Sequence, residues 1–229
     1  MKFGDSEVQD FKFGDTQVQQ LFLGDTEVWS AGGGVIIDDY IAFFKLNGDI
    51  IDDTGNYTAS PNATNTFISF GNKQGLKMEN YVNGTFDSTI TFPPNSTICY
   101  WIESSDIALQ NSVPMAFDDS NFFMAQRADL WVSYEAQGSE HIITEVNTPT
   151  FVVFTDNGTN IDFYKNKIKK VDIDSSYTTF SNKSLSFIGG YSASSYTITG
   201  VIADIRIYDR VLTQDEIDAV YDFEKGDYE

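Results

Sequence analysis

From residue 35 to residue 208 the sequence alternates short runs of β-branched and aromatic residues with turns rich in Asn, Asp, Gly and Ser. The runs recur about every ten residues and are too short for helices, so they predict β-strands. We count thirteen such runs, among them 96–103, 150–155 and 197–208. Many short strands at this spacing, with turn signals between them, favour an all-β antiparallel sandwich.

One helix signal stands near the C-terminus. Thr213 followed three residues later by Glu216 forms a capping box, in which each side chain accepts from the other residue's backbone N–H. The apolar residues that follow have helical spacing: Ile217, Val220 and Tyr221. Gly226 is expected to end the helix. The pattern therefore predicts one short amphipathic helix that packs on the sandwich.

The first thirty residues contain a ten-residue repeat. The pattern of an aromatic residue or Leu, then Gly-Asp, Ser or Thr, any residue and Val starts at Phe3, Phe13 and Leu23. A two-residue Gly-Asp turn predicts β-hairpins, which we expect to join as a short meander with apolar residues on both faces. Residues 1–30 could pack on the larger domain, or they could pair with copies of themselves or with a docking surface. Residues 31–34, Ala-Gly-Gly-Gly, have the composition of a linker.

The charge balance excludes whole classes of partner. The chain has 14 Lys and Arg against 34 Asp and Glu, a formal net charge of −20. Nucleic acid and anionic membrane surfaces would be repelled. The single cysteine, Cys99, excludes a disulfide framework. No apolar run approaches the roughly 20 residues that cross a bilayer, and the N-terminus lacks a secretory signal pattern.

A family resemblance enters with residues 200–221, GVIADIRIYDRVLTQDEIDAVY. This segment is similar to the final strand and short helix of the concanavalin A-like, laminin-G-like jelly-roll domains. Residues 43–60 resemble the family's opening strand and turn, and residues 160–171 resemble its Leu-Tyr-x-Asn-Gly strand. Lys167 stands where Gly usually follows the Asn, so we expect a wider hairpin there. The resemblance covers residues 35–229 and implies a two-sheet antiparallel jelly roll with one short C-terminal helix.

An acidic turn supplies the candidate metal ligands. Asp52, Asp53 and Asn56 surround Gly55, and carboxylate and amide oxygens are the ligands that Ca²⁺ prefers. The resemblance implies that this turn, together with Asp204 of the final strand, can hold one structural calcium ion. The alternative is a solvated acidic turn without a metal, in a chain that is acidic throughout.

Hydrolysis needs carboxylates that this sequence does not align. The glucanases of this superfamily carry Glu-x-Asp-x-Glu on one strand, where alternation directs all three acids into the cleft. The nearest match, Glu216-Ile217-Asp218, lacks the final acid and falls on the predicted helix. The one histidine, His141, has no neighbouring nucleophile motif. We therefore expect no catalytic residues and no enzymatic activity.

Aromatic residues suggest binding instead. The segment GGYSASSYTITG places Tyr191 and Tyr196 among small residues, a composition typical of an adaptable recognition loop. The alternative is a plain polar hairpin loop that carries two tyrosines. Trp101, in the run ICYWIES, is expected to lie in the core as the family's core-strand aromatic.

The repeat carries a second resemblance. The phrase FGDTQVQQLFLGDTEVW resembles repeats at the N-termini of tailed-bacteriophage structural proteins, such as head fibres and minor tail proteins. It implies that residues 1–30 attach to capsid or tail proteins while the jelly roll projects outward. The chain would be a virion protein made in the host cytoplasm without a signal peptide, a homo-oligomer with a trimer favoured. Its jelly roll would bind host-surface or mucus glycans. The alternatives are a decoration or fibre subunit without a ligand, and a bacterial glycan-binding protein.

Overall fold

The structure is a computed structural model of the 229-residue chain. It describes residues 37–61, 66–78, 84–105, 112–117, 123–127, 130–133, 147–170, 182, 184–188 and 199–229, and the six short strands within residues 2–30. The chain divides into two units, Met1–Asp38 and Asp39–Glu229, and each is described by itself. The predicted linker at 31–34 lies outside the described residues.

The first unit contains three β-hairpins built on the repeat. Their strands are β1 (Lys2–Phe3), β2 (Ser6–Glu7), β3 (Lys12–Phe13), β4 (Thr16–Gln17), β5 (Gln20–Leu23) and β6 (Thr26–Ser30). Phe3 pairs with Ser6, Phe13 with Thr16 and Leu23 with Thr26, which confirms the predicted two-residue spacing of each turn. The predicted meander is wrong for the described strands, because they form three separate two-stranded sheets.

The second unit is built around an eight-stranded antiparallel sheet. Its path runs β18-β17-β16-β12-β20-β10-β9, and β7 pairs with β20 beside β10. The bounds are β7 (Ala42–Phe44), β9 (Phe67–Phe70), β10 (Lys73–Met78), β12 (Ser96–Ser104), β16 (Thr150–Asp156), β17 (Ile161–Lys165), β18 (Ile168–Lys170) and β20 (Gly200–Tyr208). The last strand in the chain, β20, pairs with three others, β12, β10 and β7, and for that reason we call it the central strand.

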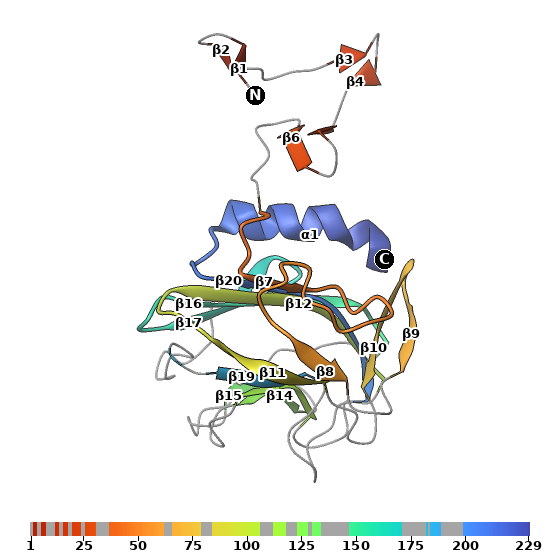
Figure 1. Cartoon of the computed structure of the whole chain (residues 1–229), viewed down its shortest axis with the longest axis vertical. Helices are drawn as coiled ribbons and strands as arrows, with labels where there is room; N and C mark the ends of the chain where they lie inside the picture. Colours follow the sequence, from red (N-terminus) through yellow and green to blue (C-terminus); the bar gives the residue numbers. More distant parts are fainter. Residues whose placement is uncertain are drawn as a thin grey trace. The chain divides into compact units, whose positions relative to one another are not determined.

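A six-stranded antiparallel sheet forms the other layer, in the order β15-β14-β13-β19-β11-β8. Its bounds are β8 (Ala59–Pro61), β11 (Gly84–Thr91), β13 (Ser112–Phe117), β14 (Phe123–Arg127), β15 (Leu130–Ser133) and β19 (Ser184–Ile188). Figure 1 shows this sheet below the eight-stranded one, with the helix α1 (Gln214–Tyr228) above. The predicted all-β sandwich with one C-terminal helix is confirmed.

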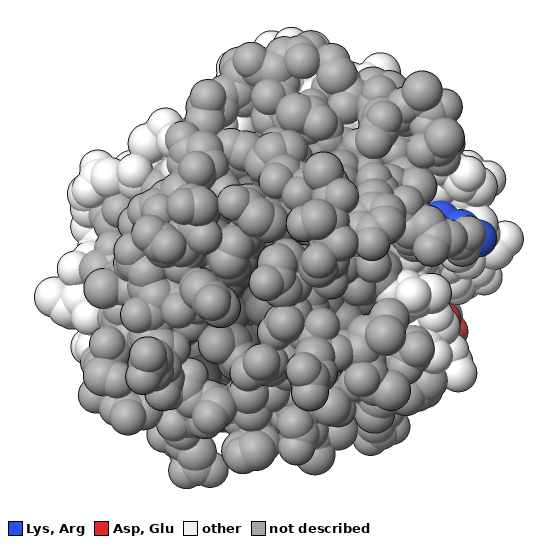
Figure 2. Space-filling view, turned by 90° about the horizontal axis from the view of Figure 1, so that it is seen from below, with Lys and Arg blue, Asp and Glu red and all other residues white. Residues whose placement is uncertain are grey.

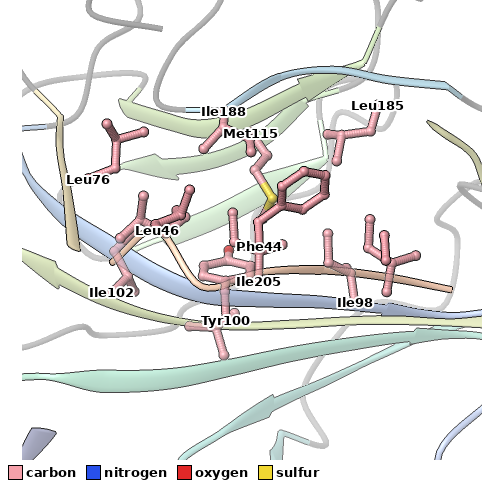
Figure 3. Close-up of a cluster of buried hydrophobic side chains, with 14 of the residues drawn as sticks. Phe44, Leu46, Leu76, Ile98, Tyr100, Ile102, Met115, Leu185, Ile188 and Ile205 are labelled. Atoms are coloured by element: carbon pink, nitrogen blue, oxygen red, sulfur yellow. The ribbon is translucent and has the colours of Figure 1, made fainter. Parts of the chain in front are cut away.

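The core fills the space between the two sheets. Figure 3 shows Met115, Leu185 and Ile188 of the six-stranded sheet facing Tyr100 and Ile205 of the eight-stranded sheet. Because successive side chains of a strand point to opposite faces, Ile98, Tyr100 and Ile102 line this core. The side chains between them, such as Trp101, point toward α1, where Trp101 stacks on two helix tyrosines.

A β-bulge bends the central strand at Asp204. On one side the register with β12 shifts between Cys99–Arg206 and Trp101–Ala203. On the other side β20 pairs with β10 up to Ile202 and with β7 from Ile205 onward. Asp204 itself has φ of 50°, a left-handed conformation that L-residues with side chains adopt at some cost. The bulge is thus the point where β20 changes its neighbour.

The helix extends further than the sequence predicted. Its capping box between Thr213 and Glu216 is confirmed, and Ile217 and Val220 are buried. Gly226 does not end it, because the helix continues to Tyr228. The β9–β10 turn accounts for this: the backbone N–H of Asn72 donates to the carbonyl of Asp227 at 2.6 Å and caps the helix end.

The opposite edge of the sheet holds the helix as well. Lys165 pairs with Ile168, so the β17–β18 turn keeps two residues, and the predicted wider hairpin is wrong. Asn166 and Lys167 both have positive φ, as a tight hairpin turn requires. Lys167 Nζ reaches both carboxylate oxygens of Asp222 on α1, at 3.0 and 3.1 Å. Lys167 thus occupies a turn position of positive φ that normally favours glycine, and its side chain forms an ion pair with the helix.

Candidate functional site

The predicted metal turn is organised around the carboxylate of Asp52, which is almost fully buried. Its Oδ1 accepts from the backbone N–H groups of Phe43 and Thr54, at 2.8 and 3.1 Å. Its Oδ2 accepts from the Thr54 hydroxyl at 2.5 Å and from the N–H groups of Asn56 and Tyr57, both at 3.0 Å. Five donors therefore engage this carboxylate, and a cation would have to displace some of them.

The other three predicted ligands point to different partners. Asp53 forms an ion pair with Lys45. The Asn56 side-chain amide donates to the Ile41 carbonyl at 3.1 Å. Asp204 Oδ2 accepts from Lys73 Nζ at 3.0 Å and from the Tyr228 hydroxyl at 2.6 Å. Within the described ranges no three His, Cys, Asp or Glu side chains gather as a metal-binding group. The residues as arranged do not fit a calcium ion, and the calcium site stays a prediction.

The helix side of the sheet holds a buried charged pair that no sequence pattern predicted. Arg206 of β20 forms an ion pair with Glu224 of α1, and both side chains are less than a tenth exposed. Glu224 Oε2 also accepts from Trp101 Nε1 at 2.8 Å. Burial raises the pKa of Glu224, and the charge of Arg206 opposes that rise. A basic residue on the last strand and an acid on the buried stripe of the predicted helix were the signals available in the sequence.

Aromatic rings complete this contact. The Trp101 ring stacks between Tyr228 and Tyr221, with ring centroids 4.5 and 5.7 Å apart and interplanar angles near 20°. Trp101 is 1% exposed, so the prediction that it is a core residue is confirmed, although it packs under the helix rather than between the sheets. Trp101 and Tyr228 are buried and Tyr221 is partly exposed, so the stacked faces are occupied by one another. We interpret this cluster as a contact that holds the helix on the sheet.

Glu216 and Asp218, the nearest match to a hydrolase motif, form contacts that stabilise the start of the helix. Glu216 closes the capping box and pairs with Arg210 at 2.6 Å. Asp218 accepts from Gln214 Nε2 at 2.6 Å. Both lie on α1 rather than on a strand that borders a cleft, as the sequence analysis predicted.

At one end of the eight-stranded sheet, the ends of several strands lie next to one another, and the chain leaves the sheet there. Ser104, Gly200 and Met78 are register partners there, so β12 and β10 end where β20 begins. The Thr199 carbonyl accepts from the backbone N–H of Ser105 at 2.9 Å and from its hydroxyl at 3.1 Å. The backbone N–H of Asn147 donates to the Ser104 carbonyl at 2.8 Å. We call this cluster of Ser104, Ser105, Asn147, Thr199 and Gly200 the loop base.

Close packing fixes the loop base. A Cβ atom at Gly200 would collide with the carbonyl oxygen of Glu103 and would lie 3.0 Å from Ser104 Cα. Only glycine therefore lets the start of β20 approach the end of β12 so closely. A rigid platform of this kind is what positions recognition loops in binding proteins.

The chain continues from the loop base into four segments outside the described residues: 79–83, 106–111, 134–146 and 189–198. Figure 2 shows the molecule from below the view of Figure 1, a face on which few described residues are visible. The predicted ligand-binding residues Tyr191 and Tyr196 belong to the segment that leads into Thr199, and they lie outside the described residues. His141 and the side chains of Trp29 and Trp131 do so too. In sequence the four segments contain five acids and neither Lys nor Arg.

The fold and the loop base together define a jelly-roll protein of the lectin type, with two packed antiparallel sheets and loops gathered at one end. The sequence model of the concanavalin A-like lectin/glucanases superfamily matches residues 89–218, more than half of the chain. The chain belongs to this superfamily. No curated protein matches it.

Solved structures share the fold at low sequence identity. Domain 4 of an extracellular arabinanase from Geobacillus stearothermophilus, in complex with arabinotriose, is 14% identical with a TM-score of 0.65. The match covers 80% of this chain and 98% of that one. The botulinum neurotoxin serotype D ligand binding domain, in complex with N-acetylneuraminic acid, is 15% identical with a TM-score of 0.57 over 82% of this chain. The serotype G binding domain is 18% identical with a TM-score of 0.59 over 81%. The chain spans about half, 51%, of each toxin domain.

No helix among the described residues is long and apolar enough to cross a membrane.

Proposed function

We propose that this chain is a non-catalytic virion protein of a tailed bacteriophage whose jelly roll binds neutral glycans at the loop base. The observation that carries the glycan proposal is the convergence of four segments on Ser104, Asn147 and Thr199, at one end of a lectin-type sandwich. Two proteins with this fold were solved with carbohydrates, arabinotriose and N-acetylneuraminic acid. Tyr191 and Tyr196 belong to one converging segment and supply rings on which a sugar can stack.

Charge favours a neutral ligand. The four segments carry Glu79, Asp106, Glu135, Glu140 and Glu145 with no Lys or Arg, in a chain of net charge −20. A sialic acid carboxylate brought to this end would meet negative potential without a basic side chain from these segments to pair with it. A neutral sugar offers hydroxyls to Ser, Thr and Asn side chains and an apolar ring face to tyrosine, without an electrostatic penalty.

The virion role rests on residues 1–30. Their ten-residue repeat resembles the attachment segments of phage structural proteins, and the three hairpins in the structure are the kind of module that such attachment would use. Many copies on one particle would make weak glycan sites effective through avidity. The net negative charge would keep many displayed copies soluble and apart.

A glycan array with the full chain, presented multivalently on beads, tests the binding proposal. We expect neutral oligosaccharides to bind better than their sialylated counterparts, and the double variant Tyr191→Ala/Tyr196→Ala to lose binding at an unchanged melting temperature. Phe223→Ala is the matched control, because Phe223 is a 63% exposed ring on α1. Stronger binding of the sialylated member would refute the neutral ligand class. Absence of any binding would favour the second candidate, a decoration subunit without a ligand.

Particle composition tests the virion proposal separately. Purified phage particles produced with the full-length gene are expected to contain this protein by mass spectrometry, and particles produced with residues 1–30 deleted are expected to lack it. Equal incorporation of the shortened protein would refute the attachment role of the repeat, whatever the glycan array shows.

A further inference from the structure

The ten-residue repeat of the sequence is also a repeat of backbone pairing. In each hairpin the residue just before Gly-Asp pairs with the residue just after it. The next pair consists of the residue two positions before Gly-Asp and the residue two positions after it. These outer pairs are Lys2–Glu7, Lys12–Gln17 and Phe22–Glu27. Three backbone units with the same local register therefore follow one another at a constant spacing of ten residues.

Each unit leaves backbone edges without a strand neighbour. Among the described residues, β1 to β6 pair only within their own hairpins, so the three repeats of one chain do not extend each other's sheets. An isolated two-stranded hairpin is marginally stable in water, and its edges are templates for a further strand. The missing neighbour has to come from outside these six strands.

The unpaired groups occupy the same position in every repeat. In an antiparallel hairpin the pair beside a two-residue turn exchanges both of its hydrogen bonds, and the next pair directs its N–H and C=O groups outward. The outward groups nearest each turn are therefore those of the pairs Lys2–Glu7, Lys12–Gln17 and Phe22–Glu27. The third hairpin differs in length, because beyond a register shift it continues to the pairs Leu21–Trp29 and Gln20–Ser30. One edge of each hairpin carries the first residue of the pair, and the other edge carries the second.

We propose that each hairpin pairs edge to edge with the same hairpin of another copy of this chain, so that three contacts form in register. When copies run in the same direction around an axis, the second strand of one hairpin lies antiparallel to the first strand of its neighbour. The antiparallel ladder then continues from copy to copy and can close as a ring. Another copy has the same ten-residue spacing, so all three contacts match at once, and each contact raises the effective concentration of the next.

The proposal goes beyond the glycan and virion roles and is tested on the purified full chain by analytical ultracentrifugation. We expect the wild type to form a closed oligomer. The triple variant Glu7→Pro/Gln17→Pro/Glu27→Pro removes the outward N–H from the second strand of every hairpin, which is the strand that would pair with the next copy, but none of the hydrogen bonds beside the turns. It should be monomeric. The matched control Glu7→Ala/Gln17→Ala/Glu27→Ala removes the same side chains, keeps the N–H groups and should remain oligomeric. A monomeric wild type, an oligomeric proline variant or a monomeric alanine control would each overturn the proposal.

A register test separates pairing in register from general stickiness. A five-residue Gly-Ser insertion between Gln19 and Gln20 moves the third hairpin away from the other two. The insertion variant should associate with itself as the wild type does, because its copies still match. Mixed with differently tagged wild type, it can make the third contact only by looping out the insertion, so mixed complexes should be weaker than the complexes that each protein forms with itself. Free mixing at equal affinity, or loss of self-association by the variant, would refute pairing in register.

Discussion

The two faces of the eight-stranded sheet are both buried, yet they are held in different ways. Toward the six-stranded sheet, β12 and β20 present apolar side chains such as Ile98, Ile102 and Ile205. Toward α1 the same strands present Trp101, Arg206 and the bulged Asp204, whose polar atoms bind partners on or near the helix. Figure 1 shows these two layers above and below one sheet.

The difference shows what kind of information each face requires. The inner face needs only apolar residues of suitable volume at every second position, and many combinations satisfy that. The outer face needs particular partners, because a buried charge without its counter-ion is costly. Substitutions on the inner face should therefore follow the volume removed, whereas those on the outer face should depend on whether a partner is left behind.

The largest effect is expected at the buried ion pair. Glu224→Ala leaves Arg206 charged and buried, and we expect the free energy of unfolding in urea to fall by about 3–5 kcal/mol. Replacing both partners by Met removes the charge together with its counter-ion and should restore most of that loss. The remaining deficit, about 1–3 kcal/mol, comes from Trp101 Nε1, which loses its acceptor. A double variant as unstable as the single one would show that the outer face depends on volume, as the inner face does.

On the inner face, Ile205→Ala should lower the free energy of unfolding by about 3 kcal/mol, because it leaves a cavity at a fully buried position. Ile205→Val removes one methylene and should cost about 1 kcal/mol. Denaturant melts of both variants check this grading. Equal losses from the two substitutions would contradict a face governed by volume.

The end of the helix provides a smaller effect. Gly71, with φ of 59°, lies in the β9–β10 turn, and a Cβ there would collide with the Asp227 carbonyl of α1. We expect Gly71→Ala to cost about 2 kcal/mol. Gly55→Ala is the control, because its φ is 71° but no atom lies within 4 Å of the added carbon, so it should cost about 1 kcal/mol. If the two variants are equally stable, the turn does not hold the helix.

At the exposed rim of the helix, Asp222 should make stability weakly dependent on pH. Hydrogen bonds from Lys225 and Lys167 hold the pKa of Asp222 below its ordinary value of 3.8. Its stabilising contribution is therefore present above that ordinary value and is lost as the pH falls through the lowered one. Comparing melting temperatures with Asp222→Asn should show a small difference at pH 6 that disappears in stronger acid. A difference that does not shrink at all as the pH falls below 3.8 would refute a role for the ionised carboxylate.

The smallest effect expected is that of calcium on the melting temperature. The carboxylates of Asp204 and Asp52 already accept hydrogen bonds from separate sets of donors, so adding Ca²⁺ or EDTA should leave the melting temperature unchanged. A rise of several degrees with calcium, reversed by EDTA, would instead support the site that the family resemblance implies. Asp204→Asn would then have to abolish that rise.

The inner face and the helix start could be predicted from the sequence, because alternation and the Thr213–Glu216 capping box are local patterns. The partnership of Arg206 with Glu224 could not, since nothing in the spacing of two residues on different elements states that they meet. Gly226 misled for the same reason: its effect as a helix terminator is local, whereas the cap at Asp227 comes from Asn72, far away in sequence.

The candidate sites show the same limit. The acidic turn placed Asp52 and Asp53 next to each other in sequence, but the first binds backbone N–H groups and the second pairs with Lys45. Composition identified the carboxylates, but it could not predict which partners each of them binds. The recognition loop with Tyr191 and Tyr196 was proposed from composition alone. The loop base, which this segment joins at Thr199, depends on Gly200 and on strand register, which a single sequence does not reveal.

The central place of β20 has a consequence for how the protein is made. During synthesis the repeat region and β7 to β19 leave the ribosome before this strand does. Among the described strands, only β20 joins the β12–β16–β17–β18 group to the β9–β10 hairpin and to β7. Before β20 emerges, these strand groups are not paired with one another and expose apolar surface, because pairings between residues distant in sequence form late. The domain can therefore close only after Tyr208 has emerged, and the hairpins at the N-terminus are free to meet other chains before that moment.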